Sequence, residues 1–450
     1  MKNIIVLMTF FVPLVLFPQA LMGGEYSLLY RSPQVPQSIR AYSMYPKSNL
    51  FTVTFHIVGS TGAPTFPMEG FDFDGEKVWE LDISRWHVWR ETVVPNKKLA
   101  AFTELSACPK PLAVENCESE PEGYMFNVAS GAVLYHSTRF ARFHPEFTFD
   151  GKYMLGQFGV GYSDEGGGEY SPSTGTCLME IDTGREIWCR EEVVREHNAL
   201  LSEASGIIVG DKGIYEFYSG RRIITFPQFA KKGDNTFKPQ TPGNAVVIRA
   251  MSLDGRYFVA TEGKCDKRTV EDGCHLIALK DPETYLGEWD KGIVRKKLLA
   301  FEEGVQDVNF HPFSFLPSGL LVVLNPYRQQ LRLLTMKGEI LSTISHEKVS
   351  DLPYYSLWFL QPDIDFDNKV IIWPSRNKGE WSVYGFNGKL IGRFAWKEPH
   401  GHKFTIRDFK MISDREYVFV VDVQMKAERK AQEWVLEVYR GKFALLENGK

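Results

Sequence analysis

The stretch Phe147 to Arg190 decides the fold; it reads FTFDGKYMLGQF, then a glycine-rich segment, then CLMEIDTGREIWCR. Its first part holds two short apolar runs about the turn Asp150-Gly151. Its last part holds two alternating runs about the turn Asp182 to Gly184. Short alternating runs joined by tight glycine turns are typical of β-hairpins. Two successive hairpins predict one four-stranded antiparallel sheet.

The same pair of hairpins recurs eight times along the chain. The first-hairpin turns lie near Ser48, Asn96, Asp150, Ser205, Asp254, Ser318, Asp367 and Ser413, at steps of 46 to 64 residues. Each is followed by a second hairpin before the next repeat begins. A four-stranded sheet alone exposes two apolar faces, and stacking such sheets in a ring buries both. The sequence therefore predicts an all-β protein, an eight-bladed β-propeller, with seven blades and a stray hairpin as the alternative.

The chain behaves in this pattern as one domain. Its 450 residues would suggest two or three domains by length alone, but the unbroken repeat predicts a single propeller over residues 25–450. Hydrophobic residues make up 44% of the chain and aromatic residues 14%, which suits an all-β core. The net charge of −4 argues against nucleic acid as a partner.

The N-terminal residues 1–24 have the features of a signal peptide. Lys2 supplies the positive charge, an uncharged apolar run extends from Ile4 to Leu21, and Gly23 and Gly24 are small residues near a cleavage point. Two prolines within the run favour a cleaved leader over a membrane-spanning helix, although a retained anchor is the alternative. No other stretch is long and apolar enough to cross a membrane. We expect a secreted or periplasmic protein.

The six cysteines agree with export, because they form three pairs that are close in sequence. Cys177 and Cys189 lie symmetrically about one hairpin turn, on opposite strands, which brings their side chains within bridging distance. Local disulfides are typical of exported proteins. The expected bridges are Cys108 to Cys117, Cys177 to Cys189, and Cys265 to Cys274.

A propeller needs a contact that holds its first and last blades together. The short apolar segment Tyr26 to Tyr30 precedes the first repeat, and the last predicted hairpin covers Trp434 to Leu446. We expect Tyr26 to Tyr30 to form a strand that joins this C-terminal sheet.

The lengths of the connections predict where a binding site lies. Connections within each hairpin are short, whereas the long ones lie between strands two and three or between blades. In a propeller the two long classes emerge on the same face. Function generally resides in loops on a rigid scaffold, so this face is the predicted site. The alternative is that these loops only cap the ring.

Five residues on this face are candidate ligand or partner contacts: Trp86, His87, Tyr354, Tyr355 and His400. Each lies in a connection that enters the innermost strand of a blade, where aromatic side chains can anchor a partner. For the aromatic residues, packing between blades is the alternative.

The sequence supplies no catalytic residue and no metal site. His400 and His402 flank Gly401, but two histidines alone favour a surface turn over a metal site. The acidic glycine-rich segment Gly159 to Gly168 does not have the spacing of a calcium loop, and neither a helix nor a closing Lys-Ser or Lys-Thr supports phosphate binding. The Gly-x-Ser-x-Gly turn of the α/β-hydrolases is also missing.

The hairpin IDTGREIWCR resembles the repeat of the quinoprotein-like propellers, Asp-x-x-Thr-Gly-x-x-x-Trp. Thr183, Gly184 and Trp188 match the Thr, Gly and Trp of that pattern. Gly75 and Trp79 repeat its Gly and Trp spacing, and Gly131 with Tyr135 is a weaker match. The resemblance implies an eight-bladed ring in which the Trp side chains pack between blades.

The dehydrogenases of that family bind pyrroloquinoline quinone and calcium, and they carry a disulfide between adjacent cysteines. This chain has no adjacent cysteines and no matching set of metal ligands, so no cofactor is expected. The predicted function is a non-catalytic scaffold that binds a protein or glycan outside the cytoplasm. The alternative is an enzyme with a site on the ring axis, either a quinoprotein-like oxidoreductase or a hydrolase or lyase.

Overall fold

The computed structural model describes most of the ring strands and their short turns. The described residues are 26–32, 35–36, 38–57, 67–81, 87–95, 98–105, 123–140, 142–158, 175–191, 199–210, 213–225, 231–232, 236–237, 244–265, 279–290, 293–301, 313–325, 328–346, 362–365, 368–375, 379–413, 416–425 and 433–442. The predicted signal peptide, residues 1–24, lies outside them.

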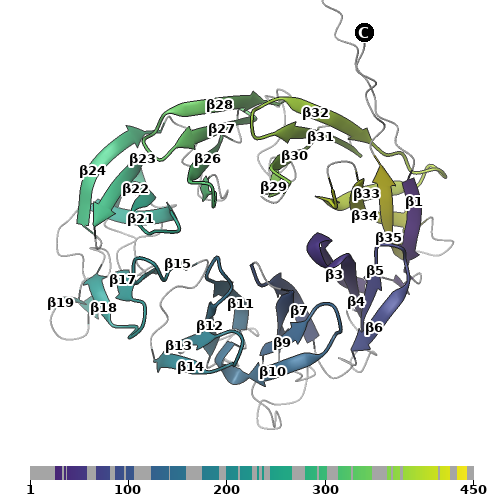
Figure 1. Cartoon of the computed structure of the whole chain (residues 1–450), viewed down its shortest axis with the longest axis horizontal. Coiled ribbons are helices and arrows are strands. Elements are labelled where there is room, and N and C mark those ends of the chain that lie inside the picture. Colours follow the sequence, from purple (N-terminus) through teal and green to yellow (C-terminus); the bar gives the residue numbers. More distant parts are fainter. Residues whose placement is uncertain are drawn as a thin grey trace, which may run out of the picture.

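Eight antiparallel sheets, each of four main strands, stand in a ring around a central axis (Figure 1). Blade 1 contains β3 (Ser38–Tyr45), β4 (Leu50–Ile57), β5 (Met68–Asp72) and β6 (Lys77–Leu81), and blade 2 contains β7 (His87–Val93), β8 (Leu99–Leu105), β9 (Gly123–Asn127) and β10 (Val133–Ser137). Blade 3 contains β11 (Arg142–Phe147), β12 (Tyr153–Phe158), β13 (Gly175–Glu180) and β14 (Glu186–Arg190), and blade 4 contains β15 (Leu200–Ser202), β16 (Ile207–Val209), β17 (Gly213–Glu216) and β18 (Arg222–Thr225).

Blades 5 to 8 complete the ring. Blade 5 contains β21 (Asn244–Met251), β22 (Tyr257–Cys265), β23 (Leu279–Asp290) and β24 (Ile293–Ala300), and blade 6 contains β25 (Phe313–Phe315), β26 (Leu320–Asn325), β27 (Gln330–Thr335) and β28 (Ile340–Ser345). Blade 7 contains β29 (Asp363–Asp365), β30 (Val370–Pro374), β31 (Glu380–Gly385) and β32 (Leu390–Ala395), and blade 8 contains β33 (Lys403–Met411), β34 (Glu416–Met425), β35 (Glu433–Lys442) and β1 (Tyr26–Arg31). The predicted fold class is confirmed, with eight blades rather than seven. A short hairpin, β19 (Lys231–Lys232) and β20 (Thr236–Phe237), follows blade 4.

Blade 8 closes the ring with strands from both ends of the chain. β1 pairs antiparallel with β35, and the two-residue strand β2 (Val35–Pro36) extends this pairing. The backbone N–H of Ser32 donates to the carbonyl of Leu436 at 2.9 Å, and the N–H of Leu436 donates to Ser32 Oγ at 2.9 Å. The predicted closure by the N-terminal strand is confirmed.

The hairpin predicted about Gly441, however, is wrong. β35 runs straight through Gly441, which pairs with Tyr417 of β34. A Cβ atom at Gly441 would lie 2.5 Å from the Tyr417 ring, so the glycine is needed for close packing between strands rather than for a turn. The fourth strand of this blade is therefore β1.

Alternation along each strand buries both faces of a blade. In β34, Val418 and Val420 pack against blade 1, whereas Phe419 and Val421 pack against blade 7. Successive side chains of a strand point to opposite faces of the sheet. Each inner and middle strand therefore packs against both neighbouring blades, and the interface between two neighbouring blades is called a seam below. The apolar core is thus divided among the seams of the ring.

The same kind of aromatic contact occurs at three of the seams. The indole N–H groups of Trp79 and Trp188 each donate to a backbone carbonyl of the following blade, that of Val128 and that of Phe217, both at 2.7 Å. The hydroxyl of Tyr135 donates to the carbonyl of Ile181 at 2.7 Å in the same way. The expected packing of these Trp side chains between blades is confirmed for both.

Each of these rings lies against a glycine of the next blade's outer turn. A Cβ atom would come within 2.6 Å of the Trp79 ring at Gly131, 3.0 Å of the Tyr135 ring at Gly184, and 2.8 Å of the Trp188 ring at Gly220. All three glycines have positive φ, between 62° and 67°. The glycine of the repeat therefore serves both the turn and the seam.

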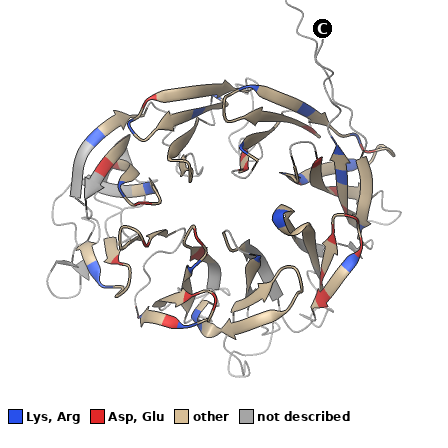
Figure 2. Ribbon diagram, viewed as in Figure 1, with Lys and Arg blue, Asp and Glu red and all other residues tan. Residues whose placement is uncertain are grey.

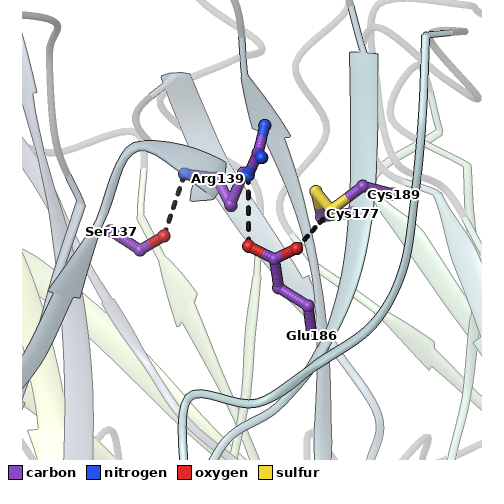
Figure 3. The surroundings of a disulfide bond; sticks show 5 residues. All are labelled: Ser137, Arg139, Cys177, Glu186 and Cys189. Carbon is purple, nitrogen blue, oxygen red and sulfur yellow. Dashed lines mark hydrogen bonds and ion pairs between the residues drawn. A yellow bond between two sulfur atoms is a disulfide. The ribbon is translucent and has the colours of Figure 1, made fainter.

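A disulfide links the two outer strands of blade 3. Cys177 and Cys189 are directly opposite in the pairing of β13 with β14, with their Cα atoms 4.2 Å apart (Figure 3). Beside it, the Glu186 carboxylate accepts a hydrogen bond from Arg139 Nε of blade 2 at 3.1 Å. This predicted bridge is confirmed, whereas Cys108, Cys117, Cys274 and the side chain of Cys265 lie outside the described residues.

Candidate binding face

The strand order places all the long connections at one end of the ring. Because the four strands of a blade run antiparallel in chain order, the turns within each hairpin emerge at the opposite end. The hairpin turns are tight: β5 ends at Asp72 and β6 begins at Lys77. By contrast, β8 ends at Leu105 and β9 begins at Gly123. The end that carries the longer connections is hereafter the long-connection face.

One predicted site residue, His400, is described in full on this face. It is exposed in the connection between β32 and β33. The Glu398 carboxylate accepts the backbone N–H groups of His400 at 2.8 Å and of His402 at 2.6 Å. Gly401, with φ of 72°, completes the turn. The two imidazole rings are 6.0 Å apart, and the turn presents His400 on a rigid support.

The other predicted site residues are not brought together by the described part of the chain. His87 is the first residue of β7 and pairs through its backbone with Leu105, but its side chain is not described. Trp86, Tyr354 and Tyr355 lie outside the described residues. His400 alone among the five can be placed as a side chain.

A polar and aromatic cluster between blades 6 and 7, at the same face, was not predicted. The imidazole of His346 stacks on the buried Trp373, with ring centres 5.1 Å apart, and its Nδ1 lies 3.1 Å from the Tyr384 hydroxyl. The Trp373 indole N–H donates to the side chain of the buried Gln329 at 3.2 Å. The only sequence signal was position, since His346 begins the connection that carries Tyr354 and Tyr355.

Charged side chains gather on the inner strands of blades 7 and 8. Lys410 of β33 is paired with Asp363 of β29, and its Nζ lies 3.8 Å from Asp408 Oδ1. Burial raises the pKa of Asp408, and Lys410 opposes that rise. Burial lowers the pKa of Lys410, but Asp408 and Asp363 outweigh it, so its pKa is raised overall. Lys410 is therefore a charged ammonium, which cannot act as a nucleophile.

The described residues do not form a metal site. No group of three or more His, Cys, Asp and Glu side chains within the described ranges could hold a metal ion. The described part of the chain also has no helix long and apolar enough to span a membrane. The long-connection face therefore presents the imidazole of His400, held by the Glu398 turn. The seams beneath it contain the aromatic cluster of His346 and Trp373 and the ion pair of Lys410 with Asp363.

Comparisons with known proteins return similar folds only. No protein-family model matches the chain, and no curated protein matches it. Among solved structures, the C-terminal WD40 domain of Sif2 matches with 11% identity and a TM-score of 0.44, covering 91% of this chain and 97% of that one. Dihydro-heme d1 dehydrogenase NirN matches with 11% identity and a TM-score of 0.45, covering 92% and 76%. Hsv2p of Kluyveromyces lactis matches with 8% identity and a TM-score of 0.38, covering 92% and 100%.

These similarities say nothing about activity, because one fold hosts many functions. The class defined by the fold is the eight-bladed β-propeller. The quinoprotein-like resemblance stays a prediction within that class.

Proposed function

We propose that this protein is an exported, non-catalytic propeller scaffold that binds a protein or glycan through its long-connection face. The observation that carries the proposal is the rigid turn from Glu398 to His402, which presents an exposed imidazole on that face. The opposite end is built from tight turns with little room for a ligand. The Cys177–Cys189 bridge supports a location in an oxidising compartment outside the cytoplasm.

The ring makes a suitable scaffold because three of its seams are held by contacts at the end opposite the long connections. The indole and phenol contacts of Trp79, Tyr135 and Trp188 all lie at the opposite end, next to the outer hairpin turns. Long connections can therefore vary in sequence without loss of the ring. We infer that Trp86, His87, Tyr354, Tyr355 and His400 contact the partner.

The experiment compares two sets of substitutions on the two faces. The double variant Tyr354→Ala with Tyr355→Ala, and separately His400→Ala, should each weaken binding to a glycan array or to partners identified by proximity labelling. Asn387→Ala and Lys337→Ala, in tight turns of blades 7 and 6, should bind as the wild type does. Loss of binding in the tight-turn variants alone would place the site on the other face.

One observation favours a second candidate, an enzyme with an axial site. Asp408 lies on an inner strand and has a raised pKa, which suits a carboxyl group that donates a proton. Against this, its Oδ1 already accepts the backbone N–H of Phe409 at 2.8 Å, and Lys410 lies close by. Screening chromogenic esters and glycosides tests it: turnover that Asp408→Asn abolishes would support the enzyme and contradict the scaffold.

A further inference from the structure

The outer strand of blade 6, β28 (Ile340–Ser345), has an edge that pairs with no described strand and carries no protective charges. It is the last strand in the order of its sheet, and its sequence is ILSTIS. Of the eight outer strands within the described ranges, only β28 and β10 contain no Asp, Glu, Lys or Arg. Charged residues on an edge strand normally prevent another strand from pairing with it. Apart from a bulge at Leu341, where the register with β27 shifts, β28 lacks such protection and is open to strand addition.

Exposure distinguishes β28 from β10. Leu341 and Ile340 are 58% and 55% exposed, which makes them the two most exposed large hydrophobic side chains of the described chain. In β10, Leu134 is 48% exposed and Val133 is 36% exposed. An aliphatic surface this open, on an edge with free backbone groups, is typical of a docking site.

The apolar surface continues onto the next blade. Gly388, in the turn before β32, lies against β28, because a Cβ atom there would be 2.4 Å from Ser342 Oγ. Leu390 and Ile391 follow this turn and are 46% and 41% exposed. Figure 2 shows β28 without charge along its length, and the next blade carries Lys389 in the turn before β32 and Arg393 on β32.

Two cations at this junction form no ion pair with any residue that the structure describes. Lys389 and Arg393 are exposed and make no salt bridge with any described residue. By contrast, some other surface cations are paired, such as Lys152 with Glu203 at 2.9 Å. At the opposite end of β28, the exposed Glu339 precedes Ile340. The edge is thus apolar in the middle and basic at the β32 end, while the exposed Lys337 offsets the charge of Glu339 at the other end.

The size of the surface indicates what covers it. Four half-exposed aliphatic side chains present on the order of 400 Å², within the range of a functional patch on a monomer. A stable interface with a folded protein or a second copy needs roughly twice that area per partner, about 800 Å². A short extended segment fits better, because its backbone also satisfies the free N–H and C=O groups of β28.

We propose that β28 binds an extended peptide segment of a partner protein as an added, antiparallel strand. Antiparallel pairing is the more stable arrangement per residue. Since β28 runs toward β32, an antiparallel segment begins at β32, so its N-terminal residues are acidic and face Lys389 and Arg393. Its middle is aliphatic, and its C-terminal end lies beside the turn that carries Lys337 and Glu339. This site is independent of the long-connection face.

The test uses a fluorescent peptide of sequence DEVTVTVK and fluorescence anisotropy. The wild-type protein should bind it, and Leu341→Lys should weaken binding by about tenfold or more by placing a charge on the edge. Lys389→Glu should weaken binding and reduce its dependence on salt. Val78→Lys is the matched control, since Val78 is 50% exposed on β6 of blade 1 and should leave the affinity within about twofold.

Hydrogen exchange locates the peptide and guards against misfolding. Addition of DEVTVTVK should protect the backbone amides of Ile340 to Ser345, and Ile340→Lys should abolish that protection while the melting temperature stays near that of wild type. Three results would overturn the proposal: no binding of the peptide, equal binding of a charge-exchanged peptide KKVTVTVE, or protection of β28 by phosphatidylserine vesicles but not by the peptide.

Discussion

At the scale of the residue, the decisive feature is a glycine that faces an aromatic ring across a seam. Gly131 has a φ of 67° and lies against Trp79, whose indole N–H reaches the carbonyl of Val128. The sequence identified the pair Gly75 and Trp79 as a motif within one blade. It could not show that Trp79 contacts Gly131, because that contact joins two successive repeats.

Gly131→Ala should destabilise the ring more than Gly206→Ala does. Both glycines have positive φ, 67° and 70°, so alanine is strained at either by about 1 kcal/mol. Only at Gly131 would the new methyl group lie 2.6 Å from the Trp79 ring, whereas nothing lies within 4 Å at Gly206. Overpacking should add about 1–3 kcal/mol, measured by urea unfolding. If both variants lost the same free energy of unfolding, the contact between Gly131 and the Trp79 indole would contribute nothing to stability.

At the scale of the element, three strands attach blade 8 to its neighbours: β1 and β35, from the two ends of the chain, and the charged strand β33. β1 contributes the ring of Tyr30, which packs on Phe71 with centres 4.7 Å apart, as well as its backbone pairing with β35. β33 contributes Lys410, which pairs with Asp363 of blade 7. Both contacts tie blade 8 to a neighbouring blade.

Deleting residues 26–31 should lower the melting temperature of the whole ring by about 10 °C or more. The deletion leaves the edge of β35 unpaired and uncovers Phe51 and Phe71 of blade 1, which contact Tyr30. Leu28→Ala is the control, since Leu28 is 47% exposed and β1 stays paired. An unchanged melting temperature after the deletion, followed by differential scanning calorimetry, would contradict the role assigned to β1.

Lys410→Met should destabilise the protein most at neutral pH. Without the ammonium, Asp408 and Asp363 repel each other, so the raised pKa of Asp408 rises further in the folded state. A carboxyl with a raised folded pKa costs stability above its unfolded pKa, and this cost disappears as the pH falls. The expected loss is about 1–3 kcal/mol at pH 7 for a half-buried group.

The measurement is urea unfolding at pH 7 and pH 4.5, with Lys403→Met as the control. Lys403 is an exposed lysine of the same strand, β33, without a described ion pair, and its loss should have little effect at either pH. A deficit for Lys410→Met that grows at low pH would contradict the assignment.

At the scale of the whole molecule, the seams are unequal. Seams between blades 1 and 4 carry an indole or phenol that donates to the next blade. At the seam between blades 5 and 6 the corresponding contact is Leu299 against Gly338, and between blades 6 and 7 it is Ser342 against Gly388. These smaller side chains make no hydrogen bond to the next blade's turn among the described residues.

The seam between blades 6 and 7 is also held by the Trp373 indole N–H, which donates to Gln329, so native-state hydrogen exchange should show that the ring opens first between blades 5 and 6. Amides of β22 and β26 should exchange through a partial opening with a lower free energy than those of β8 and β12, because weaker seams separate before stronger ones. A single opening free energy for all four strands would contradict this order.

The sequence by itself determined the all-β class, the eight repeats, the closure by Tyr26 to Tyr30 and the Cys177–Cys189 bridge. It could do so because each depends on local signals: tight glycine turns, alternation of period two, and cysteines opposite each other in one hairpin. His400 is exposed in the connection between β32 and β33, and the role of all five residues in binding stays a prediction.

Only the tertiary structure decided how β35 continues through Gly441, how Lys410 finds Asp363, and how His346 stacks on Trp373. These contacts join residues of different blades or of opposite chain ends. The repeat in the sequence determines which strands form each blade. Which side chains contact each other across a seam depends on how the blades pack in the closed ring. The uncharged edge of β28 likewise becomes a candidate docking surface only when β28 is known to be the outermost strand of blade 6.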